Sequence, residues 1–356
     1  MLLSASDLSL AEQSDLILPQ LSPELGEHTS QETHAAVIEL MTGVHRDVVG
    51  AVAELSMLRR QLAAELRGLG ARAAAAGIYP LDSAEATRIS RASRYRVIAD
   101  SMRTLARREP TMALHVHVGS PDPDDAVRVL RRLREHVPVL LALSANSPFS
   151  RGKPTGFAST RTVVFDQFPR TGLPRAFACY RDYVEAIDGL IVSGALPDPT
   201  FLWWDVRLQP ALGTVEVRAL DAQSTAADNG PLAALVQSLA RLELEDQPAE
   251  SLISPEILAE NRFLAARDGL DARLVDPAGS KLVSVRGRLA DLVDRCRPHA
   301  RALGCIKELE RVAGLAADNG AIRQRGWVHA GRDLPSMVSR LCEQFAAPPP
   351  MTCVHL

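Results

Sequence analysis

The positions of hydrophobic and polar residues along the chain predict short strands separated by long helices. Residues 113–119 alternate strictly between apolar and polar side chains, which is typical of a strand with one buried face. Residues 203–210 and 214–220 alternate in the same way and are joined by a short loop, which indicates an antiparallel hairpin. An apolar stretch at 35–40 predicts one more strand.

Apolar residues at helical spacing predict helices over much of the remaining chain. The predicted helices cover residues 48–67, 82–107, 174–194, 231–246, 255–268, 280–302, 305–316 and 333–346. Asp82 is expected to cap the second of these, and Asp122 to cap a further helix that has Pro123 at its first position. Because the strands form a hairpin and do not alternate regularly with helices, we predict an α+β fold with a largely antiparallel sheet.

The beginning of the chain differs in character from the rest. Residues 1–31 are polar, weakly patterned and contain two prolines, so we predict a loose leader there. Residues 32–346 are expected to form a single domain, followed by a C-terminal tail at 347–356. Within the domain, residues 144–172 are rich in Gly, Pro and Ser and predict a long loop of the kind that often carries function.

Composition narrows the classes of protein to which the chain can belong. It has 356 residues, of which 46% are hydrophobic, enough for a sizeable core. A net charge of −3 gives no electrostatic attraction to nucleic acid or to an anionic membrane. The longest apolar stretch, 137–143, is too short to cross a bilayer. The five cysteines are scattered without a CxxC pair, so we expect neither disulfides nor a zinc site. Cysteines without disulfides are typical of the reducing cytoplasm, so we expect a soluble cytoplasmic protein.

Two histidines share one face of the predicted strand at 113–119. Side chains alternate across a strand, so His115 and His117 project from one face and the apolar residues from the other. Two imidazoles on one face can supply a metal ligand and a hydrogen-bond donor, or bind a phosphate. A surface strand with two ordinary histidines explains the same pattern, and the pattern alone leaves both interpretations open.

The predicted hairpin places charged residues opposite one another. If 210–213 forms the loop, Arg207 faces Glu216 and Asp205 faces Arg218, while the other face of the hairpin is purely apolar and must pack against helices.

Two interpretations fit these facing charges. One is a solvated face with ordinary cross-strand ion pairs. The other is a site in which Glu216 ligates Mg²⁺ and arginines neutralise phosphoryl oxygens. Glu39, in the predicted strand at 35–40, is a third candidate ligand if it lies on the same sheet.

Several segments together resemble a known family. They are HVHVG at 115–119, SANSPFSRGKPTGFASTR at 144–161, WWDVRLQPALGTVEVRALDAQ at 203–223, ENRFLAARDGLDA at 260–272 and NGAIRQR at 319–325. In this order they resemble the carboxylate–amine ligases of the second glutamate–cysteine ligase group, the YbdK-like proteins. The resemblance implies a fold related to glutamine synthetase, with a curved, mostly antiparallel sheet whose concave face holds ATP and divalent metal ions.

The resemblance also implies an activity and a set of site residues. Such enzymes use ATP with Mg²⁺ or Mn²⁺ to phosphorylate a carboxylate, typically the γ-carboxylate of glutamate, which an amine then converts to an amide. By the matching positions, the resemblance assigns metal binding to Glu39, His117 and Glu216. It assigns ATP binding to His115, Arg207 and Arg218, and gives both arginines a catalytic role as well. It places Asn146, Arg151 and Arg161 at the border of the substrate.

The chain departs from the family pattern in three places. The family opens with a metal-binding strand resembling GVEEE, and nothing in 1–33 matches it; the stretch at 24–27 is a poor substitute. Tyr79 and Gln209 stand where histidine is usual. Besides an active ligase whose opening strand is replaced or precedes Met1, these departures leave open a non-catalytic or repurposed relative and an ATP-independent amide hydrolase or acyltransferase. The expected partners are a small carboxylate and a small amine, and the expected assembly is a homodimer.

Overall fold

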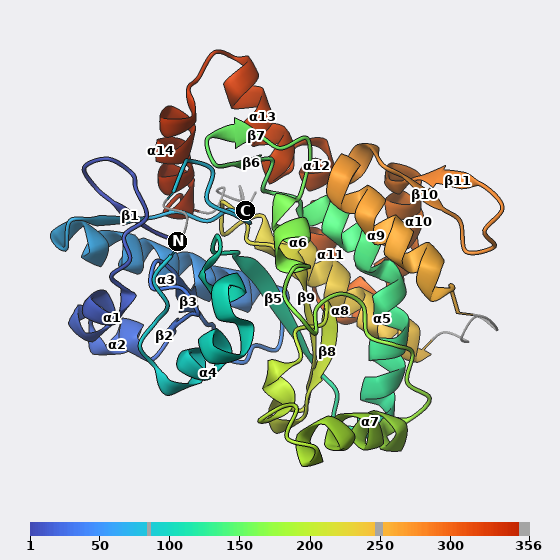
Figure 1. Cartoon of the computed structure of the whole chain (residues 1–356). Coiled ribbons are helices and arrows are strands. Elements are labelled where there is room, and N and C mark those ends of the chain that lie inside the picture. Colours follow the sequence, from blue (N-terminus) through green and yellow to red (C-terminus); the bar gives the residue numbers. More distant parts are fainter. Residues whose placement is uncertain (84–86, 246–251, 349–356) are drawn as a thin grey trace.

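The computed structural model describes residues 1–83, 87–245 and 252–348, so most of the predicted tail at 347–356 lies outside the described residues. Its strands pair in antiparallel fashion and pack with a larger number of helices, which confirms the predicted α+β class (Figure 1). No helix in the described ranges is long and apolar enough to cross a membrane.

A three-stranded sheet lies at the centre of the molecule, in the order β5 (Ala113–Gly119), β9 (Thr214–Asp221) and β8 (Val206–Gln209). The register of the β8–β9 hairpin is the predicted one, with Arg207 opposite Glu216. β5 pairs with the other edge of β9 and places His117 opposite Glu216. The two antiparallel ladders therefore align the predicted site residues on neighbouring strands.

Four further antiparallel pairs surround this sheet. They are β1 (Leu2–Ser4) with β4 (Ala71–Ala73), β2 (Thr29–Gln31) with β3 (Ile38–Leu40), β6 (Phe149–Ser150) with β7 (Lys153–Pro154), and β10 (Arg273–Val275) with β11 (Leu282–Ser284).

Helices make up most of the remaining structure. The longer ones are α3 (Val48–Gly68), α4 (Ser93–Met102), α5 (Pro123–Ser144), α7 (Tyr180–Val192), α8 (Asn229–Glu245), α9 (Pro255–Asp268), α10 (Val285–Ala302), α13 (Gly320–His329) and α14 (Leu334–Phe345). Shorter helical segments are α1 (Ser14–Ile17), η1 (Leu18–Gln20), α2 (Pro23–Gly26), η2 (Arg103–Arg107), α6 (Thr160–Phe165), η3 (Pro199–Phe201), η4 (Pro210–Leu212), η5 (Gly269–Asp271), α11 (Ile306–Glu310) and α12 (Val312–Ala317). The predicted cap of α5 is confirmed, since the Asp122 carboxylate accepts from the backbone N–H groups of Asp124 and Asp125.

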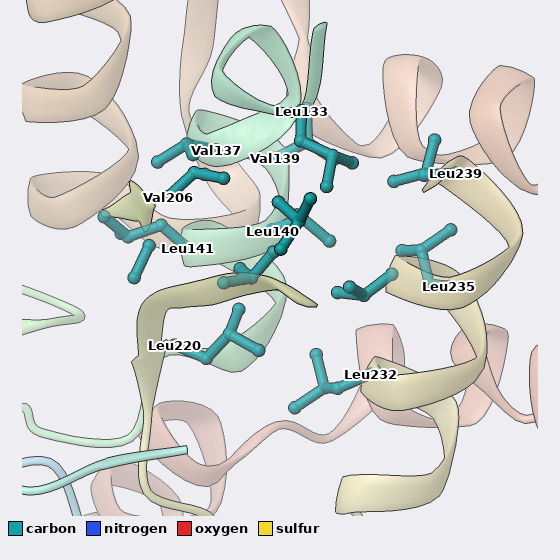
Figure 2. Close-up of a cluster of buried hydrophobic side chains, with 14 of the residues drawn as sticks. Leu133, Val137, Val139, Leu140, Leu141, Val206, Leu220, Leu232, Leu235 and Leu239 are labelled. Atoms are coloured by element: carbon teal, nitrogen blue, oxygen red, sulfur yellow. The ribbon is translucent and has the colours of Figure 1, made fainter. Parts of the chain in front are cut away.

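The main core lies between the apolar face of the central sheet and the helices. Leu140 of α5 sits among Val206 and Leu220 from the sheet and Leu232 and Leu235 from α8 (Figure 2). All five are fully buried, and burial of such side chains stabilises the fold by about 1.5–3 kcal/mol each. The opposite, charged face of the sheet lies toward β3, since His115 of β5 lies 3.7 Å from Glu39 of β3.

The prediction of a loose leader is wrong for residues 1–31. This segment forms β1, α1, η1, α2 and β2, and buries Leu2, Ile17 and Leu25 in a cluster with Leu58 and Leu62 of α3. The apolar residues of the segment follow neither a helical nor a strand period, because the segment consists of elements only three or four residues long. Irregular spacing therefore concealed a buried segment.

The second predicted helix begins later than Asp82 suggested. Residues 84–86 lie outside the described residues, and α4 starts at Ser93. Before it, Arg88 O accepts from Ala35 N, and Ser90 N donates to Thr33 O. These long-range backbone hydrogen bonds satisfy groups that a helix would have paired locally, so tertiary pairing overrode the local capping signal.

Candidate functional site

Glu216 of β9 is the centre of a charged cluster on the sheet face opposite the core. Its side chain is 1% exposed. Arg207 Nε donates to Oε2 at 2.6 Å, Arg218 Nη1 donates to Oε1 at 2.5 Å, and Gln209 Nε2 donates to Oε2 at 2.9 Å. The alternation of β8 and β9 places all four side chains on one face, so the hairpin register alone assembles this part of the site.

Both histidines of β5 and Glu39 of β3 border the same carboxylate. His115 Nδ1 lies 3.5 Å from Glu216 Oε1 and 3.7 Å from Glu39 Oε1. His117 Nε2 lies 3.8 Å from Glu216 Oε1, and its Nδ1 is 2.9 Å from Thr214 Oγ1. Thus Glu39, which lies far from Glu216 in the sequence, reaches it through His115. The structure brings these candidates together, and their individual roles stay predictions.

The electrostatic environment keeps Glu216 ionised and His115 neutral. Burial opposes ionisation of Glu216, but the charges of Arg218 and Arg207 outweigh it and hold its pKa well below the usual range. Burial and the neighbouring Arg218 lower the pKa of His115 to about 4. A neutral imidazole beside a carboxylate keeps a ring nitrogen lone pair available to a metal ion at neutral pH.

Glu32 belongs to this region and was missed by sequence reasoning. It follows the end of β2, whose Ser30 pairs with Glu39 and donates from Oγ to Glu39 Oε2 at 3.2 Å. Burial and the like charge of Glu39 raise the pKa of Glu32. In the sequence, Glu32 stands out only as a carboxylate seven residues before Glu39. That spacing places the two side chains near each other only because the three-residue strand β2 pairs with β3.

The chemistry of these donors fits a hard divalent cation, although the side chains are not arranged around one. Across the described ranges, no group of three or more His, Cys, Asp or Glu side chains is placed to hold a metal ion. Glu32, Glu39 and Glu216 nevertheless offer the carboxylate oxygens that Mg²⁺ and Mn²⁺ prefer, and a cation would relieve the repulsion between Glu32 and Glu39. Glu216 would have to exchange an arginine contact for the metal.

Arg161 lies in α6, within the segment predicted as a long loop, and contacts the backbone of β9. Its side chain is buried, and its guanidinium donates to the backbone oxygens of Arg218 and Ala219. Arg161 therefore supports the strand that carries Glu216 and Arg218. Its predicted contact with substrate stays a prediction.

Asn146 and Arg151 have partners outside the cluster. Asn146 is fully buried; its Nδ2 donates to Ala222 O and Ser224 Oγ, and its Oδ1 accepts from Gln324. Arg151 Nε donates to Glu109 Oε1 at 2.6 Å. The geometry thus gives Asn146 a place in the internal framework, and the substrate role predicted for both residues stays a prediction.

The predicted ion pair between Asp205 and Arg218 is wrong. The backbone register is right, since Arg218 N donates to Asp205 O at 2.7 Å. The Asp205 carboxylate, however, is buried beneath α9 and pairs with Arg262, whose Nε lies 2.5 Å from Oδ2. Arg262 approaches from a helix 57 positions further along the chain, which strand pairing cannot anticipate.

The family model for glutamate–cysteine ligase family 2 matches residues 4–343. The chain belongs to this family. A relative from Rubrobacter xylanophilus is 37% identical over 344 residues, covering 96% of this chain and 92% of the relative. One from Gloeobacter violaceus is 37% identical over 323 residues, covering 90% and 87%. Both relatives carry the provisional name glutamate–cysteine ligase 2, and the predicted resemblance is confirmed.

Two solved structures share the fold at low sequence identity. A glutamate–cysteine ligase from Francisella tularensis in complex with AMP matches with a TM-score of 0.66 at 12% identity, covering 98% of this chain and 87% of the other. A bifunctional glutathione synthetase from Pasteurella multocida matches with a TM-score of 0.65 at 12% identity, covering 96% of this chain and 50% of the other. The predicted fold type is thereby confirmed.

Proposed function

We propose that this member of glutamate–cysteine ligase family 2 is an ATP-dependent ligase that joins a glutamate-like carboxylate to an amine. The observation that carries the proposal is the buried Glu216 carboxylate, held between two arginines and bordered by two histidines and Glu39 on one sheet face. A mixture of carboxylates and guanidinium groups suits a reaction in which metal-bound polyphosphate is both held and neutralised.

The two arginines differ in what they have left to offer a phosphoryl group. Arg207 is occupied on both sides, since its Nε donates to Glu216 and its Nη1 donates to Leu202 O at 2.8 Å. Arg218 donates to Glu216 through Nη1, and its buried Nε has no hydrogen-bond partner. Arg218 is therefore the better placed to donate to a phosphoryl oxygen, and Arg207 to hold Glu216 in position.

Glu39, His117 and Glu216 would hold Mg²⁺ or Mn²⁺, with Glu32 beside them. When bound, the metal would supply positive charge that neutralises the polyphosphate. Around it, burial and neighbouring charges keep Glu216 ionised and His115 neutral.

The proposed reaction has two steps. A carboxylate oxygen of the substrate forms a bond to the γ-phosphorus of ATP as the bond to ADP breaks, which gives an acyl phosphate. The amine nitrogen then bonds to the carbonyl carbon, phosphate leaves with the electron pair of the C–O bond, and the amine loses a proton to solvent. Positioning and charge neutralisation account for most of the catalysis in such phosphoryl transfers.

The test is an assay of purified protein with ATP, Mg²⁺, glutamate and either cysteine or hydroxylamine. The proposal expects ADP release that requires glutamate, and a glutamyl hydroxamate when hydroxylamine intercepts the acyl phosphate. Turnover of an amide or ester without ADP release would overturn the proposal in favour of a hydrolase or acyltransferase. Absence of ATP binding at millimolar nucleotide would favour a non-catalytic relative.

We expect Arg218→Ala to lower kcat by about 100-fold, because a charge-assisted hydrogen bond to the transferring group is worth roughly 2.7–4 kcal/mol. The melting temperature should also fall, since Arg218 pairs with the buried Glu216 carboxylate, so kcat is compared per folded molecule below the melting range. Arg181→Ala is the matched control, because Arg181 is 86% exposed and pairs with Glu185 on α7. A kcat for Arg218→Ala within threefold of the control would remove Arg218 from the reacting centre.

A further inference from the structure

A cavity lies among the helices of the molecule, apart from the Glu216 cluster. Its volume is about 610 Å³, and α5, α6, α9 and the segment 171–175 surround it. None of its lining residues belongs to the charged cluster on the central sheet. Cavities of this size commonly hold small organic molecules.

Arg134 of α5 lines this cavity, and its guanidinium forms no hydrogen bond to a carboxylate among the described residues. The residue is 3% exposed, and its Nε is buried without a hydrogen-bond partner. Within the described ranges, no carboxylate or carbonyl oxygen pairs with its guanidinium. The neighbouring Glu135 is occupied elsewhere, since it accepts from Ile253 N at 2.9 Å and pairs with Arg132 at 3.1 Å.

A buried guanidinium N–H without a hydrogen-bond acceptor is costly. Burial lowers the pKa of Arg134, which reflects this cost, and the charge of the neighbouring Glu135 opposes the shift only in part. An anion in the cavity would offset the cost.

The other arginines of the cavity are already neutralised. Arg262 forms hydrogen bonds to both carboxylate oxygens of Asp166, and its Nε pairs with Asp205. Arg175 pairs with Asp182 at 2.5 Å and lies over the ring of Phe177. Among the arginines that line the cavity, Arg134 is therefore the one whose guanidinium forms no hydrogen bond to a carboxylate of the described residues.

The remaining walls are largely apolar. Leu173, Pro174, Leu258, Ala259 and Phe263 contribute hydrocarbon surface, and the Phe263 side chain remains 44% exposed. A single guanidinium beside apolar walls matches a carboxylate on an apolar body, because guanidinium binds carboxylate through two parallel hydrogen bonds. A polyphosphate would require several free cations, and the cavity offers one.

We infer that this cavity is a binding site for a small organic monocarboxylate, with the carboxylate on Arg134 and the apolar part against Leu258 and Phe263. The site is separate from the proposed ATP site and stands whether or not the ligase activity is found.

The probe is 3-phenylpropionate, compared with the neutral 3-phenylpropionamide and with inorganic phosphate, by thermal shift and by saturation-transfer NMR. At ten times its dissociation constant the carboxylate should raise the melting temperature by about 2 °C. The amide and phosphate should leave it unchanged. An equal response to the amide, or a response to phosphate alone, would overturn the inference.

Two variants place the binding within the cavity. Arg134→Leu should weaken binding of 3-phenylpropionate at least tenfold without lowering the melting temperature of the ligand-free protein, because it removes a buried N–H that has no hydrogen-bond acceptor. Ala259→Trp, at an exposed lining position, should weaken binding equally by filling the cavity while leaving Arg134 in place.

Arg131→Leu is the matched control on the same helix, outside the cavity lining, and should bind normally. Glu216→Gln should also bind normally, which separates this site from the proposed ATP site. Undiminished binding by both Arg134→Leu and Ala259→Trp, or a strong loss in Arg131→Leu or Glu216→Gln, would place the carboxylate elsewhere and overturn the inference.

Discussion

Glu216→Gln is expected to lower turnover by roughly a thousandfold, which corresponds to about 4 kcal/mol of transition-state stabilisation. The substitution keeps the shape of the side chain and removes its charge. Arg207 and Arg218 then lose the anion that both contact, and the proposed metal loses its most buried ligand. Because metal binding depends on carboxylate charge, Mg²⁺ should no longer strengthen ATP binding.

Calorimetric titration of ATP with and without Mg²⁺ measures this effect directly, alongside the rate of ADP release. Glu243→Gln is a closely matched control. Glu243 is also a buried carboxylate, paired with Arg132 at 3.0 Å and with His136 at 2.7 Å, but it lies between α5 and α8. Both variants break a buried ion pair, which typically costs about 3–5 kcal/mol of stability.

Only Glu216→Gln should affect turnover per folded molecule. If Glu216→Gln retained Mg²⁺-dependent ATP binding, or if both variants lost turnover equally, Glu216 would have a structural role alone.

The part of the site that depends on strand alternation could be predicted from the sequence. A short loop at 210–213 fixes the hairpin register, and a period of two then places Arg207, Glu216 and Arg218 on one face. The same period predicted the shared face of the β5 histidines. These inferences needed only local geometry, which the order of residues specifies directly.

Contacts between distant segments could not be predicted in the same way. Glu32 enters the site because β2 folds back on β3, and neither three-residue strand has enough positions to show a period. Asp205, just before β8, forms its ion pair with Arg262 of α9. Leu2, Ile17 and Leu25 of the first segment are buried because they pack in one cluster with residues of α3 and β4. These contacts depend on how side chains from distant segments pack together. The order of apolar and polar residues along the chain does not specify that packing.

Asn146 has structural contacts that its motif did not predict. The segment that contains Asn146 led to the family, and its predicted contact with substrate stays a prediction. Its amide joins the end of β9 to α13, through Ala222, Ser224 and Gln324. The backbone N–H of Asn146 also donates to the buried Asp221 carboxylate at 2.8 Å. These bonds fix the C-terminal end of the strand that carries Glu216.

Gly320→Ala is expected to destabilise the protein by about 3–5 kcal/mol, among the larger effects of a single substitution. Gly320 begins α13, and a Cβ placed there would lie 1.8 Å from Asn146 Oδ1 and 2.2 Å from its Cγ. Asn146 is fully buried and bonded on every side, so it cannot move without leaving polar groups unpaired. Either the helix shifts or the hydrogen bonds that hold the end of β9 are lost.

Urea unfolding followed by circular dichroism measures this loss, and Gly326→Ala provides the control within the same helix. Gly326 is exposed, and nothing lies within 4 Å of a Cβ built on it, so alanine there should stabilise the protein by up to about 1 kcal/mol through helix propensity. The two substitutions are chemically identical and differ only in whether Asn146 faces the added methyl group. Equal unfolding free energies for the two variants would show that Asn146 does not pack against α13 as described, and would remove the physical basis for its place in the framework behind Glu216.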